Sequence, residues 1–282
     1  MFAIIDFEST GPDAKTDRMT EVGLIRVNSD WRVEASYSRL INGSDYAPLT
    51  EEIQAFNGIT QEMLDREGVD PRVALEAICG LLAPCEAVVA YNKAFDETIY
   101  RAEMARAFPI QGVSHLPHTP SWLCAMTECP WPAKINTHWK PLKYLALDLG
   151  LAVDPSQLHR AIHDAELTLR VLKDGRGGPY TIERMQEYAA DPWVYIAIDI
   201  PHPKRDEGSG RDYAVAQGYR WLKIHKAHPL TFERMWVKRI KGSTLDVFKA
   251  EKGPYDRAVV YSDAWSEEKK RDAYGVSTTQ ES

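Results

Sequence analysis

The stretch FAIIDFESTG, residues 2–11, is an apolar run that ends in two carboxylates placed two residues apart. Because consecutive side chains of a strand point to opposite faces, Asp6 and Glu8 share one face and Phe7 takes the other. The apolar residues before them do not alternate with polar ones, which predicts a central strand covered on both faces. Ionised carboxylates are costly to bury without cations, and an oxygen-rich site of this kind suits Mg²⁺ or Mn²⁺. Taken alone, an Asp-x-Glu pair at a strand end is more often a solvated turn than a metal site, so a metal site requires partners from the rest of the chain.

The composition is that of a globular protein. Of the 282 residues, 44% are hydrophobic and 27% are charged, which fits one large domain or one domain with an extension. No apolar run approaches the length of a membrane span, and the first strand begins without a basic, apolar leader. We therefore expect no membrane contact and a cytoplasmic location. The cysteines are too few for a dense disulfide framework and are expected to be reduced thiols: Cys79, Cys85, Cys124 and Cys129.

Strand-like and helix-like stretches alternate after the first strand. The further predicted strands are 19–27, 31–41, 86–91 and 122–127. The predicted helices are 71–83, 93–108, 140–149 and a last helix that starts near Ala161, while 47–67 reads as a loop with a short helical piece. Three strands followed by alternating helices and strands predict an α/β fold, a mixed five-stranded sheet with helices on its faces.

The glycine cluster at 175–178 is the clearest boundary in the chain. It predicts a first domain over 1–175, a Gly-rich linker over 176–182, a small α+β or β-rich accessory domain over 183–262 and a polar tail over 263–282.

Charge is spread unevenly along the chain. The net charge of −7 argues against a protein that coats long duplex DNA. Residues 203–252, however, hold twice as many Lys and Arg as Asp and Glu, and aromatic side chains are interleaved with them. Cations for phosphates and flat rings for bases suit nucleic-acid binding. The alternative is a small β-rich domain whose tryptophans form its core.

Two further acids stand where this fold could bring them to the end of the first strand. Asp96 lies in the first turn of a helix that directly follows a strand, after Asn92, which can cap that helix. Asp164 lies early in the last helix, five residues after His159. On a helix that spacing separates two side chains by roughly 140°. His159 and Asp164 therefore share a site only if His159 lies in the loop before the helix.

Such a set of residues has a specific chemical use. Two divalent ions held roughly 3.5–4 Å apart by carboxylates can activate water and stabilise the leaving oxygen of a phosphodiester. A neutral histidine at the rim can take the proton of the attacking water, because it titrates near neutrality.

The segments DFESTG, YNKAFD and HRAIHDAELT, in this order, resemble the three exonuclease motifs of the DEDDh group of 3′-5′ exonucleases, within the DnaQ-like superfamily. The segments AFNGITQEML, SWLCAM and LKYLALDLGL add to the similarity, which covers roughly residues 1–175. A tyrosine subgroup of this superfamily carries its tyrosine where this chain has Arg160, so the histidine variant is indicated. Trp122, Cys124 and Met126 resemble an element of a DNA-degrading branch, which favours DNA over RNA.

The resemblance implies an RNase H-like fold, two Mg²⁺ or Mn²⁺ ions and stepwise release of 5′-nucleoside monophosphates from a 3′ end. It implies that Asp6 bridges the ions, that Glu8 and Asp164 hold the first ion, that Asp96 supports the second and that His159 is the general base. For the substrate, it implies that Ser9, Thr10 and Gly11 approach the terminal nucleotide and that Asn92 and Phe95 position it. Phe56 and Ile59 either contact substrate or pack the loop onto the sheet.

Several alternatives stay open. Within enzymes, the chain could be an exoribonuclease of the ribonuclease T or oligoribonuclease kind, or a proofreading subunit that acts with a polymerase. Outside enzymes, it could be a non-catalytic nucleic-acid-binding module. The expected partner is nucleic acid with a 3′ end, above all single-stranded DNA, with a homodimer, a polymerase or a repair protein as further candidates. A zinc site is the alternative for the ligand-type residues His115, His118, Cys124, Cys129 and His138.

Overall fold

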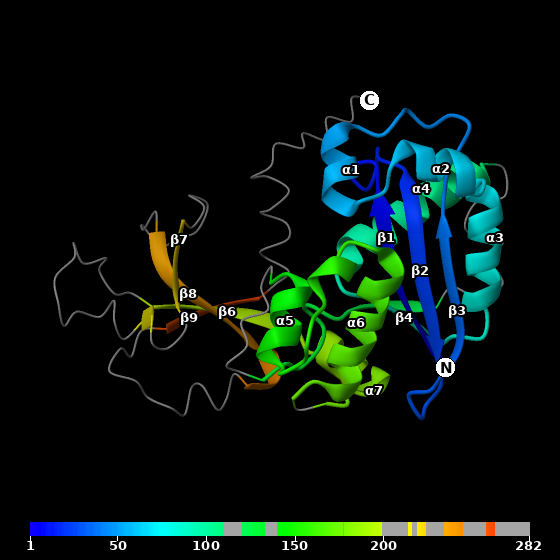
Figure 1. Cartoon of the computed structure of the whole chain (residues 1–282). Helices are drawn as coiled ribbons and strands as arrows, with labels where there is room; N and C mark the ends of the chain where they lie inside the picture. Colours follow the sequence, from blue (N-terminus) through cyan, green and yellow to red (C-terminus); the bar gives the residue numbers. More distant parts are fainter. Residues whose placement is uncertain are drawn as a thin grey trace, which may run out of the picture. The chain divides into compact units, whose positions relative to one another are not determined.

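The computed structural model describes residues 1–109, 120–132, 140–176, 178–198, 214–215, 219–223, 234–244 and 258–262. The chain forms two compact units, Met1–Ala189 and Ala190–Ser282 (Figure 1). Each unit has its own sheet. Among the helices of the described residues, none combines the length and the apolar character that crossing a membrane requires.

The first unit is built on a five-stranded sheet of order β3-β2-β1-β4-β5. Its strands are β1 (Phe2–Ser9), β2 (Met19–Val27), β3 (Val33–Leu40), β4 (Ala87–Ala90) and β5 (Ser121–Cys124). The first three strands pair antiparallel, while β4 runs parallel to both β1 and β5. The predicted mixed five-stranded sheet is confirmed. The FAIIDFESTG stretch supplies its central strand, β1.

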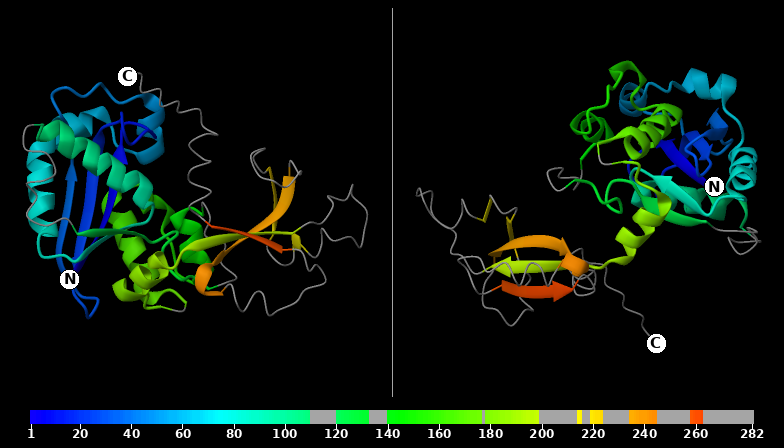
Figure 2. Two further views of the ribbon diagram at one scale, coloured as in Figure 1. Left: turned by 180° about the vertical axis from the view of Figure 1, so that it is seen from behind. Right: turned by 90° about the horizontal axis from the view of Figure 1, so that it is seen from below.

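Helices cover both faces of this sheet. The helices of this unit are α1 (Glu51–Asn57), α2 (Gln61–Glu67), α3 (Pro71–Leu82), α4 (Lys93–Ala107), α5 (Leu142–Asp148), the short 3₁₀ turn η2 (Pro155–Gln157), α6 (Ala161–Asp174) and α7 (Ile182–Ala190). Ala3, Ile5 and Phe7 of β1 pack in the core that α3 and α4 close. Phe2 and Ile4 pack on the opposite side, in the core closed by α5, α6 and α7 (Figure 2). The side-chain alternation expected of β1 therefore holds, and it turns the face of Asp6 and Glu8 toward α6.

Two local expectations differ from the structure. The stretch 47–67 forms two helices rather than a loop with one helical piece, because Thr50 and Thr60 each accept a first-turn backbone N–H through their hydroxyl groups. Asn92 precedes α4 as expected, but its side chain makes no capping hydrogen bond. The α4 helix is instead fixed by burial of its inner face, which includes Ile99 and Met104.

The boundary between the units falls later than the glycine cluster. Gly175 ends α6, but Tyr180, Ile182 and Met185 are buried in the core that α6 helps to close. The segment predicted as a linker over 176–182 therefore runs into the packed part of the first unit, and the contacts divide the chain after Ala189.

The second unit has a four-stranded antiparallel sheet of order β7-β8-β6-β9. Its elements are β6 (Trp193–Ile198), β7 (Arg220–Lys223), β8 (Arg234–Lys241), the 3₁₀ turn η3 (Gly242–Thr244) and β9 (Ala258–Ser262). Trp236 and Tyr219 are buried, which favours a core role for these two aromatic residues. The second unit thus contains a β-sheet, while the predicted polar tail over 263–282 lies outside the described residues.

Candidate active site

Three separate segments meet at the end of β1. Asp6 and Glu8 lie on that strand, Asp96 lies in the first turn of α4, and Asp164 lies in the first turn of α6. The backbone N–H of Phe7 donates to Oδ1 of Asp96 across 3.2 Å, which joins α4 directly to β1 between the two strand carboxylates. Phe7 itself is buried in the core, as its alternation predicts. The topology therefore delivers all four predicted carboxylates to one region.

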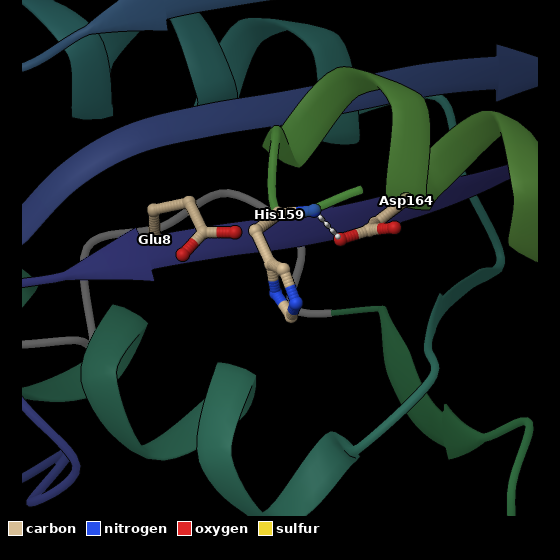
Figure 3. A group of neighbouring side chains, drawn as sticks. All are labelled: Glu8, His159 and Asp164. Atoms are coloured by element: carbon tan, nitrogen blue, oxygen red, sulfur yellow. Dashed lines mark hydrogen bonds between the residues drawn. The ribbon is translucent and has the colours of Figure 1, made fainter. Parts of the chain in front are cut away.

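Glu8, His159 and Asp164 form the tightest part of this region (Figure 3). Each offers one potential ligand atom, and these atoms all lie within 4.8 Å of one another. His159 lies before α6 begins, with a left-handed φ of 62°, and its backbone N–H donates to Oδ2 of Asp164 at 3.2 Å. The condition set by the sequence, that His159 must lie in the loop, is met.

Burial and like charges raise the pKa of the acids here. The pKa of Asp6 lies well above its usual range, first because of burial and then because of Asp96, Asp164 and Glu8 nearby. Burial also raises the pKa of Asp96 to about 8, although the hydrogen bond from the Phe7 amide opposes that rise. For Asp164, burial raises the pKa and the neighbouring His159 lowers it. Ionisation of these groups in the folded chain therefore costs free energy.

Residues 3–172 match the sequence model of the Exonuclease (RNase_T) family. The chain belongs to this exonuclease family. The assignment confirms the enzyme class expected from the motifs, an exonuclease.

Relatives and solved structures agree with the assignment. The chain is 28% identical over 175 residues to "DNA polymerase III PolC-type" of Thermotoga petrophila, a match that covers 60% of this chain and 11% of the polymerase. The homologous protein of Thermotoga maritima is 28% identical over 170 residues, with the same coverage. The chain thus spans about a tenth of the length of these curated relatives. E. coli Exonuclease I in complex with a dT13 oligonucleotide has a similar fold, with 16% identity and a TM-score of 0.55, over 85% of this chain and 63% of that one.

The carboxylate set at the end of β1 fits a divalent metal. Burial raises the pKa of each of the four acids, and neighbouring carboxylates raise it further. A cation among them would offset both effects. Carboxylate oxygens are the hard ligands that Mg²⁺ and Mn²⁺ prefer. The donor chemistry of the site therefore matches the divalent-metal dependence of the family.

Sequence inspection missed Asn57, which is buried at the end of α1. Burial and the charges of Asp164 and Glu21 raise the pKa of Glu8 to about 8, and a hydrogen bond with the Asn57 side chain opposes that rise. Asn57 also accepts the backbone N–H of Ile59 through Oδ1. In the sequence it stands before a glycine and looks like an ordinary turn residue.

The residues expected to meet the terminal nucleotide have local partners. The Ser9 hydroxyl donates to the Gly11 carbonyl at 2.6 Å, and the Thr10 hydroxyl donates to Asp17 at 3.1 Å. These bonds shape the loop after β1. Asn92 is partly buried, and Phe95 packs against the core on the α3–α4 side.

Phe56 and Ile59, which shared one interpretation in the sequence, have different surroundings. Phe56 is 62% exposed, and its ring centroid lies 4.5 Å from that of His159. Ile59 is fully buried in a small cluster with Leu40, Leu49 and Leu64. The surroundings favour substrate contact for Phe56 and loop packing for Ile59.

The residues considered for a zinc site are two cysteines and three histidines. Cys124 and Cys129 are buried free thiols, and Cys124 donates to the Tyr91 carbonyl at 3.3 Å. His115, His118 and His138 lie outside the described residues. Within the part of the chain that the structure describes, the metal-type cluster is the one of Glu8, His159 and Asp164.

Proposed function

We propose that the chain hydrolyses the terminal phosphodiester at the 3′ end of single-stranded DNA with two Mg²⁺ or Mn²⁺ ions and releases 5′-nucleoside monophosphates. The observation that carries the proposal is the convergence of four carboxylates whose pKa values are raised, beside an imidazole, at the end of β1. Asp6 would bridge the ions, Glu8 and Asp164 would hold the first, and Asp96 would support the second.

His159 is the proposed general base. Bound divalent ions supply charge stabilisation for the phosphate and a lowered pKa for water. The unprotonated ring nitrogen of His159 accepts the proton of the attacking water, whose oxygen bonds to phosphorus while the bond to the 3′ oxygen of the preceding nucleotide breaks. That oxygen takes up a proton, which balances the step. The backbone bond from His159 to Asp164 and the ring of Phe56 hold the imidazole in place.

Three observations support DNA as the substrate. The element Trp122, Cys124 and Met126 resembles that of exodeoxyribonuclease X. The curated relatives are DNA polymerases, and structures of the E. coli enzyme hold deoxyribonucleotide strands such as dT13 and dA16. The exposed ring of Phe56 offers a face on which a base can stack. The second candidate is an exoribonuclease, because the space around a 2′ hydroxyl is not fixed by the motifs.

The second unit is a proposed binding platform for the strand. Its β8 has the sequence RMWVKRIK, in which Lys238 lies over the ring of Tyr219 at 5.7 Å. Lys241 has a structural task instead, since its ammonium donates to the Asp191 carbonyl at 2.7 Å. A polymerase is the favoured protein partner because of the curated relatives, with a repair protein or a second copy of the chain as alternatives.

DNA and RNA oligonucleotides of one sequence, both labelled at the 5′ end, test the substrate. We expect the DNA to shorten stepwise and to release mononucleotides that carry a 5′ phosphate, and the RNA to be degraded more slowly. Faster degradation of RNA would replace this proposal with the exoribonuclease, and mononucleotides with a 3′ phosphate would contradict the proposed bond cleavage.

A further inference from the structure

Glu21 is a charged residue on β2, and only 1% of it is exposed. The Arg160 side chain meets it with two nitrogens: Nε lies 3.2 Å from both carboxylate oxygens, and Nη2 lies 2.8 Å from Oε1. The backbone N–H of Ala161 donates to Oε2 at 3.0 Å. The carboxylate on β2 is therefore bound by the last residue before α6 and by the first residue of α6.

The backbone of β2 also comes unusually close to the start of α6. Gly23 shares the strand face of Glu21, and a Cβ atom at position 23 would lie 2.2 Å from the backbone of Ala161 and of Ile162. Only a residue without a side chain permits this approach. Glu21 and Gly23 together fix where α6 begins, one through hydrogen bonds and the other through direct backbone packing.

His159 directly precedes Arg160 and has a backbone conformation that is rare for a residue with a side chain, with φ at 62°. Such a conformation persists only where the surroundings determine it. The imidazole is 4.5 Å from the Phe56 ring, and the amide is bonded to Asp164, but neither contact anchors the residue to the sheet. The bonds from Arg160 and Ala161 to Glu21 supply that anchor.

We infer that Glu21 and Arg160 are positioning residues that act through His159, which deepens the proposed function and rests on it. They hold the turn before α6 so that the imidazole faces Glu8 and Asp164. Hydrogen bonding to Glu21 raises the pKa of Arg160, so the guanidinium keeps its charge. The competing explanation is an ion pair that stabilises the fold and has no effect on the imidazole.

The test uses Arg160→Gln, Arg160→Lys and Glu21→Gln in the full chain, alone and combined with His159→Ala. Arg160 is suited to substitution because 37% of its side chain is exposed. With wild-type His159, we expect kcat to fall about 10- to 100-fold for Arg160→Gln. We expect KM for the oligonucleotide and the rise in melting temperature on Mn²⁺ addition to stay unchanged. Arg160→Lys, which keeps the charge but not the two-nitrogen contact, should have a kcat between those of Arg160→Gln and wild type.

The combined variants distinguish positioning from stability. Because the pair acts through the imidazole, Arg160→Gln should cause no further loss of kcat once His159 is alanine. A loss of equal size in both backgrounds would contradict the inference and leave the proposed base intact. Wild-type kcat in His159→Ala alone would instead overturn the base, and the positioning role with it. Should Glu21→Gln fail to fold, the two Arg160 variants still decide the matter.

A matched control is available in the same unit. Glu103 is a fully buried carboxylate that pairs with Arg18 at 2.7 Å and Arg106 at 2.9 Å. Glu103→Gln should lower the melting temperature and leave kcat per folded molecule unchanged. A fall in kcat as large as that of Arg160→Gln would show that loss of any buried ion pair has this effect, which contradicts a specific role.

Discussion

The backbone amide of His159 lies 3.2 Å from the carboxylate of Asp164 and donates a hydrogen bond to it, across the point where α6 begins. Helical spacing alone would turn these two side chains roughly 140° apart. The left-handed residue before the helix removes that difference, so a proposed base and a proposed metal ligand share one rigid turn. The left-handed φ of His159 therefore explains how two residues five positions apart in the sequence reach one site.

The stability of the metal-free protein should fall as the pH rises from about 5 to about 8. Burial, together with like charges, raises the pKa of Glu8 from 4.5 to about 8, and burial raises that of Asp96 from 3.8 to about 8. An acid with a raised pKa in the folded state stabilises the fold below its unfolded value, and that stability is lost as the pH rises through the folded value. Urea unfolding in EDTA across this range is the measurement. A flatter slope in Glu8→Gln is the control, and stability that rises from pH 5 to pH 8 contradicts the account.

Divalent cations should reverse this loss. Because ligand binding to the folded state alone stabilises it, Mg²⁺ or Mn²⁺ should raise the melting temperature more at pH 8 than at pH 5. Asp6→Asn should melt at a higher temperature than wild type in EDTA, since it removes an acid that is costly to ionise where it is buried, and should gain less from the metal. Asp30→Asn, at an exposed turn, is the matched control and should behave as wild type. An equal metal-induced rise in Asp6→Asn would remove Asp6 from the site.

The two histidines near Asp164 should differ sharply. His159→Gln should lower kcat by about 10²- to 10⁴-fold, because the water loses its proton acceptor. The Mn²⁺-induced rise in melting temperature should be largely kept. His163 pairs with Glu166 at 3.2 Å on the outer side of α6, so His163→Gln should keep kcat within about twofold of wild type. Steady-state kinetics decides between them, and equal losses in the two variants would argue against His159 as the base.

Phe56→Ala and Ile59→Ala should affect different quantities. Loss of the exposed Phe56 ring should raise KM for single-stranded DNA by about tenfold with little change in stability, since base stacking on an aromatic ring is worth about 1–3 kcal/mol. Loss of the buried Ile59 should lower the free energy of unfolding by about 2–5 kcal/mol. Oligonucleotide kinetics and urea unfolding of both variants test this, and a reversal of the two effects would contradict the assigned roles.

Much of the fold can be predicted from the sequence because the patterns that indicate it are local. The apolar run before Asp6 marks a central strand, and the alternation within β1 correctly places Phe7 in the core. Asp96 could be placed at a strand end because α4 follows β4 directly. The boundary of the first unit was harder, since burial of Tyr180 depends on contacts with α6 that a glycine cluster does not reveal.

The parts of the site that the sequence did not reveal depend on contacts between distant residues. Glu21 and Arg160 are 139 positions apart, and neither lies in a pattern that indicates its partner. Glu21 could be noticed only as an acid within a predicted strand, and Asn57 only as a turn residue. Such pairs are set by tertiary packing.

The most direct test of the central claim is nucleotide release from single-stranded DNA labelled at either end, by wild type and by Asp6→Asn, with Mg²⁺, Mn²⁺ or EDTA. The account predicts that wild type with either metal releases the 3′ label first, as a mononucleotide, and shortens the 5′-labelled strand stepwise. EDTA or Asp6→Asn should abolish both. Absence of release from any substrate, first release of the 5′ label, or cleavage that survives both EDTA and Asp6→Asn would contradict it.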